Sequence, residues 1–185
     1  LNHITSIKRI PEEGHVWLDR FTIRNLELFR PNSVEGKCLI DVIDQTLSPM
    51  GGRLLKRWVA LPSCDKEVII SRHNIVEFLI SDEKINELIH NVISKLSDIE
   101  RLTSKLATKK INPREIFSLK HSVELIENLK SDISKTECME LNHLIHSIEN
   151  CTDFISKVSN TLNSDPPVSI GKGNTISSSV SGELS

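Results

Sequence analysis

The 185-residue sequence has few of the features that are typical of secreted, membrane or nucleic-acid-binding proteins. Its four cysteines stand far apart and form no Cys-x-x-Cys pair, so reduced thiols in the cytoplasm are the simplest interpretation. No apolar run approaches the roughly 20 residues that a membrane-spanning helix needs. The formal net charge is only −2, which argues against a nucleic-acid-binding surface over the whole domain but allows a local basic patch. We therefore expect a cytoplasmic protein with no membrane partner.

Nucleotide-binding and catalytic signatures are also missing. A phosphate-binding loop needs the pattern Gly-x-x-x-x-Gly-Lys-Ser/Thr, so that backbone N–H groups surround the phosphates and the lysine reaches them. Both Gly-Lys pairs of this chain, at positions 36–37 and 171–172, have a proline in place of the first glycine. No Ser-His-Asp or Cys-His arrangement has a supporting context. We therefore expect no catalytic residue and no cofactor-binding residue.

A zinc site is one hypothesis for the cysteines and histidines late in the chain. Cys138, His143, His146 and Cys151 have the spacing Cys-x4-His-x2-His-x4-Cys. On one helix, with about 100° of rotation per residue, Cys138 and Cys151 lie about 140° apart around the axis. Four such side chains cannot meet at one tetrahedral ion. We predict no metal site and interpret these residues as ordinary members of helix faces.

Helical periodicity is what the sequence does contain. Apolar residues recur at steps of three and four, the pattern of amphipathic helices. Such segments begin at or after Ser48, Asp65, Asp82, Asp98 and Asn112. A further stripe covers 137–162 and breaks near residue 151. We expect Ile89 to be buried, and the inward side of the helix after Asp65 to hold Val68, Ile75, Val76 and Leu79.

Residues 46–62, TLSPMGGRLLKRWVALP, place a glycine pair beside three cations. Because no phosphate loop fits here, we interpret the stretch as a structural helix. Ser48 is its N-cap, Pro49 its first residue, and the Leu-Pro pair at 61–62 its end. The glycines are expected to allow close approach of a neighbouring backbone or to loosen the first turn.

Two segments lack a helical period. Residues 14–29 contain short β-prone or irregular pieces, and residues 164–185 are rich in Ser and Gly. We therefore predict an all-α, multi-helix bundle with a short irregular or β-prone N-terminal segment and an extended C-terminal tail. The expected parts are a segment leading into the core over 1–30, a helical core domain over 31–163 and the tail over 164–185.

Cations at two places are candidates for contacts with DNA or with other domains. Lys105, Lys109, Lys110 and Arg114 are close in sequence; they either touch phosphate or are solvated cations at a helix end. Arg24 lies three residues before Glu27, and the two either form a buried ion pair or hydrogen bond or act between domains. The candidates that we retain for weak contacts are Arg24, Lys109, Lys110 and Arg114.

Five motifs follow one another along the chain: WLDRFTIRNLEL, LIDVIDQTLSPMGGRLLKRWVALP, ISRHNIVEFL, LSDIERLTSKLATKKINPREIFSLK and DPPVSIGKGNTI. Their order and approximate spacing resemble the central core region, domain III, of the MutS family of DNA mismatch repair proteins. The residues that carry the resemblance are Leu18-Asp19, Thr22, Arg24 to Leu28, Asp44 to Pro62, Asp98 to Leu102, Ala107, Pro113-Arg114 and 165–167.

The sequence departs from the family pattern at Ser48, where the family usually has Thr, and at Ser63, where it usually has a bulky apolar residue. It contains no Phe-x-Glu, which the family's mismatch-reading domain carries, and no Walker loop. The tail VSGELS resembles the start of the family's lever helix, and the chain opens at Leu1. We therefore expect it to be an excised core region.

The resemblance implies a role. In the MutS family this core joins the connector to the levers and links the ATPase end to the DNA clamp, so the chain is expected to be a rigid, non-catalytic transmitter. ATP and magnesium are then cofactors of the full-length family protein and not of this segment. Expected partners are the connector, lever, clamp and ATPase domains, mismatched double-stranded DNA and, in the full-length protein, a second copy. The alternative is a helical adaptor of a MutS relative outside mismatch repair.

Overall fold

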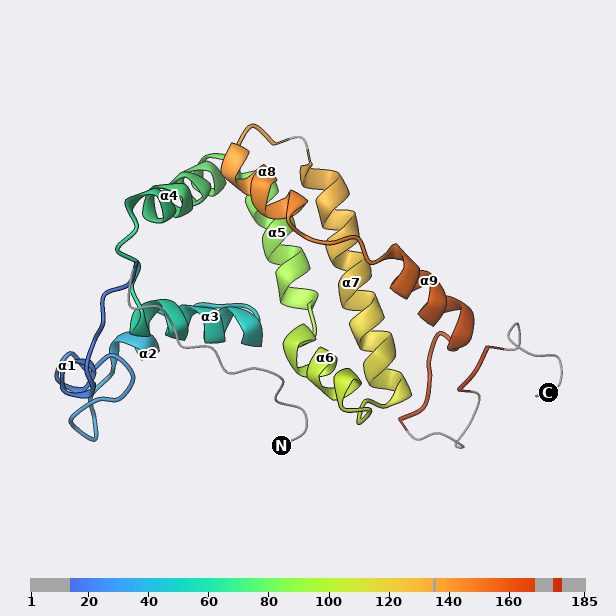
Figure 1. Cartoon of the computed structure of the whole chain (residues 1–185), viewed down its shortest axis with the longest axis horizontal. Helices are drawn as coiled ribbons and strands as arrows, with labels where there is room; N and C mark the ends of the chain where they lie inside the picture. The colour runs from blue at the N-terminus through green and yellow to red at the C-terminus, as the bar shows by residue number, and fades with distance from the viewer. Residues whose placement is uncertain (1–13, 135, 169–174, 178–185) are drawn as a thin grey trace. The chain divides into compact units, whose positions relative to one another are not determined.

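The computed structural model describes residues 14–134, 136–168 and 175–177. Over these ranges the chain forms nine α-helices and no β-strand, which confirms the predicted all-α fold (Figure 1). The contacts within the chain divide it into two compact units, Leu1–Phe78 and Leu79–Ser185. The division into 1–30, 31–163 and 164–185 stays a prediction.

Residues near the start of the first unit are partly extended and partly helical. An isolated antiparallel bridge joins His15 to Ser63. Helix α1 (Arg20–Asn25) then occupies the middle of the stretch expected to be irregular or β-prone, so that prediction is wrong for these six residues. Asp19 caps the helix, since its carboxylate accepts a hydrogen bond from Thr22 N at 2.6 Å. This local signal was present in the sequence.

The small core of the first unit forms where the chain after α1 meets α2 (Leu39–Ile43). Leu39 N donates to Glu27 O at 2.9 Å, and Ile40 N donates to Leu28 O at 3.1 Å. Leu28, Ile40 and Cys38 are buried there. These two backbone bonds hold the segment that follows α1 in a fixed position against α2.

Helix α3 (Pro49–Ala60) begins and ends as the sequence predicts. Ser48 Oγ accepts from Gly51 N at 3.1 Å, and the helix stops before Leu61. A Cβ atom at Gly51 would lie 3.2 Å from Ser48 Oγ, and one at Gly52 would lie 3.2 Å from Thr46 Oγ1. Among the described residues the nearest neighbours are therefore side chains of the preceding loop and not the backbone of another element, so the first of the two expectations for the glycines, close approach of a backbone, is not met there.

Helix α4 (Lys66–Ser81) is capped by Asp65, as predicted, because its Oδ1 accepts from Glu67 N at 2.9 Å. Its predicted inward side is only half correct. Ile75 and Leu79 are partly buried, whereas Val68 is 39% and Val76 is 54% exposed. None of its residues is fully buried. Arg72 of this helix contacts Trp58 of α3, with its guanidinium 3.7 Å from the centre of the indole ring.

The second unit contains α5 (Glu83–Lys95), α6 (Ile99–Ala107), α7 (Pro113–Ile133), α8 (Met139–His146) and α9 (Thr152–Thr161). Three of them begin where the sequence predicted a helical segment to start: Asp82, Asp98 and Asn112 each accept a hydrogen bond from a first-turn backbone N–H. The stripe over 137–162 breaks as predicted, with Cys151 at the start of α9. Local capping chemistry therefore sets most of these helix boundaries.

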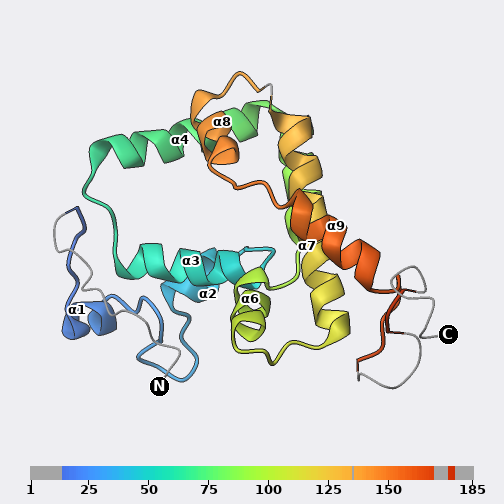
Figure 2. The same ribbon diagram turned by 45° about the vertical axis from the view of Figure 1, so that its right-hand side comes forward.

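Helix α7 is the centre of the second unit, because α5, α6, α8 and α9 all pack against it. Figure 1 shows α5 and α6 along one side of α7 and α9 along the other, and Figure 2 shows α9 crossing α7. The buried side chains of this unit come from α6 to α9 and from the residues next to these helices: Leu102, Pro113, Leu119, Ser122, Ile133, Cys138, Leu141, Ile145, Val158 and Pro166.

Two polar contacts fix connections onto α7. Buried Ser122 donates to Ser118 O at 3.0 Å and accepts from Ser97 N at 3.0 Å, which attaches the α5–α6 connection. Glu127 Oε1 accepts from Cys151 N at 3.0 Å, which attaches the α8–α9 connection. Ile89, expected to be buried, is only partly buried.

The described parts of the tail return to the end of α9. Leu162 and Ile176 form an isolated antiparallel bridge, and Ser177 N donates to Thr161 O at 2.9 Å. The rest of the tail, including its Gly-Lys pair and the VSGELS segment, lies outside the described residues. Among the described residues, no helix is both long and apolar enough to cross a membrane.

Candidate functional site

The four candidate contact residues lie in two places. Arg24 is on α1 in the first unit, whereas Lys109, Lys110 and Arg114 surround the α6–α7 connection in the second. The structure gives the three cations of the second unit different surroundings.

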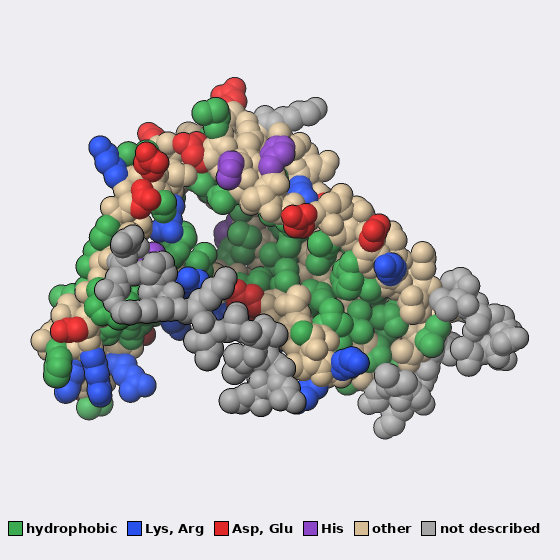
Figure 3. Space-filling model, viewed as in Figure 1, with side chains coloured by type: hydrophobic (Ala, Val, Ile, Leu, Met, Phe, Trp, Pro, Cys, Tyr) green, Lys and Arg blue, Asp and Glu red, His purple; other side chains and the backbone are tan. Residues whose placement is uncertain are grey.

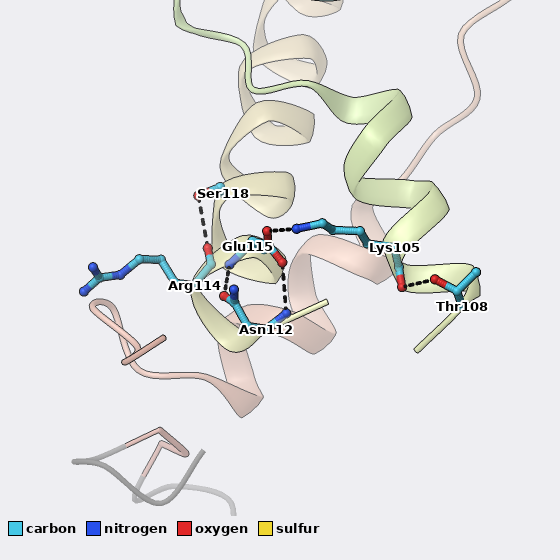
Figure 4. Close-up of polar contacts among 6 residues, drawn as sticks. All are labelled: Lys105, Thr108, Asn112, Arg114, Glu115 and Ser118. Atoms are coloured by element: carbon cyan, nitrogen blue, oxygen red, sulfur yellow. Dashed lines mark hydrogen bonds and ion pairs between the residues drawn. The ribbon is translucent and has the colours of Figure 1, made fainter. Parts of the chain in front are cut away.

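The α6–α7 connection is held by a capping box with an added ion pair (Figure 4). Asn112 Oδ1 accepts from Glu115 N at 2.9 Å, and Glu115 Oε2 accepts from Asn112 N at 3.1 Å. Lys105 of α6 pairs with Glu115 Oε1. The hydrogen bond from Lys105, and then that from Asn112 N, keeps the pKa of the Glu115 carboxyl below its ordinary value. Lys105 is therefore an internal partner and not a free cation for phosphate.

Lys109 holds a conformation that side-chain-bearing residues seldom adopt. Its φ is 55°, in the left-handed region. Lys110 N donates to Lys105 O at 2.9 Å and Lys109 N donates to Leu106 O at 3.0 Å, which is the Schellman pattern of helix ends. Both lysines are exposed, and neither has an acidic partner in the described part of the chain. This tight turn therefore presents two adjacent cations to solvent.

Arg114 points away from the Lys105–Glu115 pair (Figure 4). Its Nε donates to Pro166 O and its Nη2 donates to Asp165 Oδ1, each at 3.3 Å. The arginine therefore ties the Asp-Pro-Pro segment after α9 to the start of α7. Since Asp165 is 89% exposed, this ion pair contributes little to stability.

Arg24 and Glu27 do not form the buried pair that was one of the two expectations. Glu27 has φ 49° in a second Schellman turn, and its Oε1 accepts from Asn32 N at 3.1 Å. Arg24 is exposed, and its contacts among the described residues use its backbone O, which accepts from Asn32 Nδ2 at 3.4 Å. The arginine side chain is thus turned toward solvent.

The side chain of Arg24 lines a pocket of about 470 Å³ in the first unit. We call it the arginine pocket, and its lining residues are Arg20, Ile23, Arg24, Phe29, Arg30, Pro31 and Asn32. Arg20 and Arg30 were not candidates from the sequence. The signal for Arg20 was its spacing of four from Arg24 on one helix; no sequence pattern placed Arg30 beside them.

The residues considered for zinc do not gather. Cys138 is buried and its thiol lies 3.7 Å from Glu140 Oε2, while His146 Nδ1 lies 2.8 Å from Asn142 O. Within the described ranges no three His, Cys, Asp or Glu side chains are arranged to hold a metal ion.

Comparison with known proteins agrees with the geometry of a helical core. Residues 21–179 match the family described as MutS domain III. The DNA mismatch repair protein MutS of Christiangramia forsetii is 47% identical over 184 residues, which cover 100% of this chain and 21% of that protein. Those of Flavobacterium johnsoniae and Flavobacterium psychrophilum are 46% and 44% identical with the same coverage. The chain thus spans about a fifth of the length of these relatives, and it belongs to the MutS family, in which it corresponds to domain III.

Proposed function

We propose that this chain is the core of a MutS-type mismatch repair protein and transmits changes between an ATPase end and a DNA clamp. The observation that carries the proposal is the packing of α5, α6, α8 and α9 around α7 in a chain that matches domain III. Helices packed on one central helix move as a unit between discrete arrangements and so can pass on a displacement.

The chain itself does no chemistry in this proposal. It binds no cofactor, and ATP and magnesium act at the ATPase domain of the longer protein. Its partners are the connector, lever, clamp and ATPase domains, a second copy in a homodimer, and mismatched DNA through the whole protein, all in the cytoplasm. Lys109, Lys110 and Arg24 make weak contacts with DNA or with other domains, while Arg114 holds the tail.

A domain exchange tests this function. The matching segment of the Flavobacterium johnsoniae protein, which is 46% identical, is replaced by this chain in cells that lack their own mismatch repair protein. The chimera should lower the mutation rate nearly as well as the unaltered relative. A stable, correctly expressed chimera that leaves the mutation rate at the level of the deficient cells would contradict the proposal and favour an adaptor role outside mismatch repair.

A further inference from the structure

Three arginines line the arginine pocket, and no acidic residue among those described lines it. Arg20, Arg24 and Arg30 are all exposed, and none forms an ion pair within the described part of the chain. Arg20 and Arg24 are four residues apart on α1, where like charges destabilise a helix. An anion in the pocket would remove this repulsion.

The nearby carboxylates are already engaged. Asp19 accepts from Thr22 N at 2.6 Å and caps α1. Glu27 Oε1 accepts from Asn32 N at 3.1 Å and holds the turn that follows. These two acids fix the backbone on either side of α1, and within the described residues neither forms an ion pair with the three arginines, so the pocket has room for a further carboxylate from another segment.

The pocket is not purely cationic. Ile23, Phe29 and Pro31 line it together with the arginines, and Trp17, Phe21 and Leu26 are 63%, 75% and 58% exposed around α1. Figure 3 shows Lys and Arg side chains beside hydrophobic ones over the region of α1. Arginine next to exposed aromatic and aliphatic side chains is the composition of protein interfaces. A phosphodiester backbone would offer the apolar members of this pocket nothing to contact.

We propose that the arginine pocket binds an acidic polypeptide segment that also carries apolar side chains, supplied by the part of a MutS-type protein outside this domain. The inference rests on the proposed function and names one of its interdomain contacts. The occupant's carboxylates pair with the guanidinium forks, and its apolar side chains cover Ile23 and Phe29. The relatives are long enough to supply such a segment, because this chain spans 21% of their length.

Binding of this chain to peptides tests the proposal. The probes are short overlapping peptides that cover the Christiangramia forsetii protein outside its matched segment, offered up to millimolar concentration, with a short duplex DNA and inorganic phosphate as separate arms. At least one acidic peptide with apolar residues should bind. The triple variant R20Q/R24Q/R30Q should weaken it about tenfold or more, as expected when charge-assisted hydrogen bonds are lost.

Matched variants distinguish binding in the arginine pocket from attraction by the overall positive charge of the first unit. K56Q/R57Q/K66Q changes the net charge equally at other exposed positions of the first unit and should weaken binding less than about twofold. Replacing the three arginines by lysine should recover only part of the affinity, since the planar fork is lost. Phe29→Ala should weaken peptide binding and leave duplex binding unchanged. Thermal melts confirm that each variant folds.

Several results would overturn the inference: no peptide binds, the triple variant binds as well as the original chain, or the triple variant loses duplex or phosphate binding instead of peptide binding. Its failure is distinct from failure of the proposed function. If no peptide binds while the chimera still lowers the mutation rate, only the pocket assignment is wrong. If peptides bind through the arginines but the chimera does not repair, only the transmitter function is wrong.

Discussion

At the scale of single residues, the helix ends show what left-handed positions cost. Glu27 and Lys109 both occupy the left-handed position of a Schellman turn, with φ 49° and 55°, where glycine is the usual residue. Glu27 compensates with its hydrogen bond to Asn32 N at 3.1 Å. The side chain of Lys109 makes no such hydrogen bond in the described part of the chain. No contact there offsets the strain of its left-handed backbone conformation.

Lys109→Gly should therefore stabilise the chain. Relief of the left-handed conformation is worth about 1 kcal/mol in the free energy of unfolding, measured by urea denaturation. Lys109→Ala is the control, because it removes the same charge and keeps the Cβ atom. A glycine variant less stable than the alanine variant would show that the turn is not strained.

Glu115 gives a prediction about pH. Its hydrogen bonds from Lys105 and Asn112 keep its pKa below the ordinary value of a glutamate carboxyl. A carboxyl with a depressed folded-state pKa adds stability above the ordinary pKa, and that stability is lost as pH falls through the folded-state pKa. Glu115→Gln should therefore destabilise the chain at neutral pH, and the difference should vanish in acid. A difference that persists unchanged at low pH would mean that the ionised carboxylate is not the source.

At the scale of elements, capping residues were sufficient to predict most helix starts from the sequence. Ser48, Asp82, Asp98 and Asn112 act within one turn of their own position, so no tertiary information is needed. Helices α1 and α2 were missed because helices of six and five residues are too short to show a period.

Burial and the arginine pocket were harder to predict, because both depend on tertiary structure. Val76 fits an apolar stripe in the sequence, yet it is 54% exposed, since a period shows which residues share a face and not whether a neighbour covers it. Arg30 reaches the pocket of Arg20 and Arg24 only because the left-handed turn at Glu27 redirects the chain after α1.

The glycine pair of α3 gives a prediction for that helix. Cβ atoms at Gly51 and Gly52 would both lie 3.2 Å from a hydroxyl of the loop before the helix. Because both positions are equally crowded, Gly51→Leu and Gly52→Leu should each destabilise the chain, by about 1–3 kcal/mol of overpacking. Arg57→Leu at an exposed position of the same helix is the control for thermal melts. If either glycine variant is as stable as the wild type, the side chains of the loop before α3 can move aside without cost.

The central position of α7 gives a second prediction for an element. Leu119 on α7 is 3% exposed, so Leu119→Ala should cost about 2–5 kcal/mol, as for other fully buried leucines. Ile89 on α5 is only partly buried, and Ile89→Ala should cost clearly less. Both are measured by urea denaturation at constant protein concentration. Equal costs would contradict α7 as the centre of the packing.

At the scale of the whole molecule, a transmitting core should not read mismatches itself. The isolated chain should not hydrolyse ATP, and it should bind paired and mismatched duplexes equally. Weak binding through Lys109 and Lys110 should fade between about 50 and 200 mM salt, because phosphate contacts release counterions. Fluorescence titrations of both duplexes at the two salt concentrations measure this. A preference for the mismatch above about tenfold would mean that the core recognises DNA directly.

The transmitter role itself is tested most directly by coupling in the chimera with the Flavobacterium johnsoniae protein. ATP turnover is compared on mismatched and paired duplex, with the original core and with a Leu119→Val core that loosens the packing on α7 while the protein stays folded at the assay temperature. The account predicts that the variant still binds mismatched DNA and still hydrolyses ATP, but that its turnover depends much less on the mismatch. The transmitter role would be contradicted if the Leu119→Val core melts at a measurably lower temperature than the original core and ATP turnover still depends on the mismatch as strongly as before.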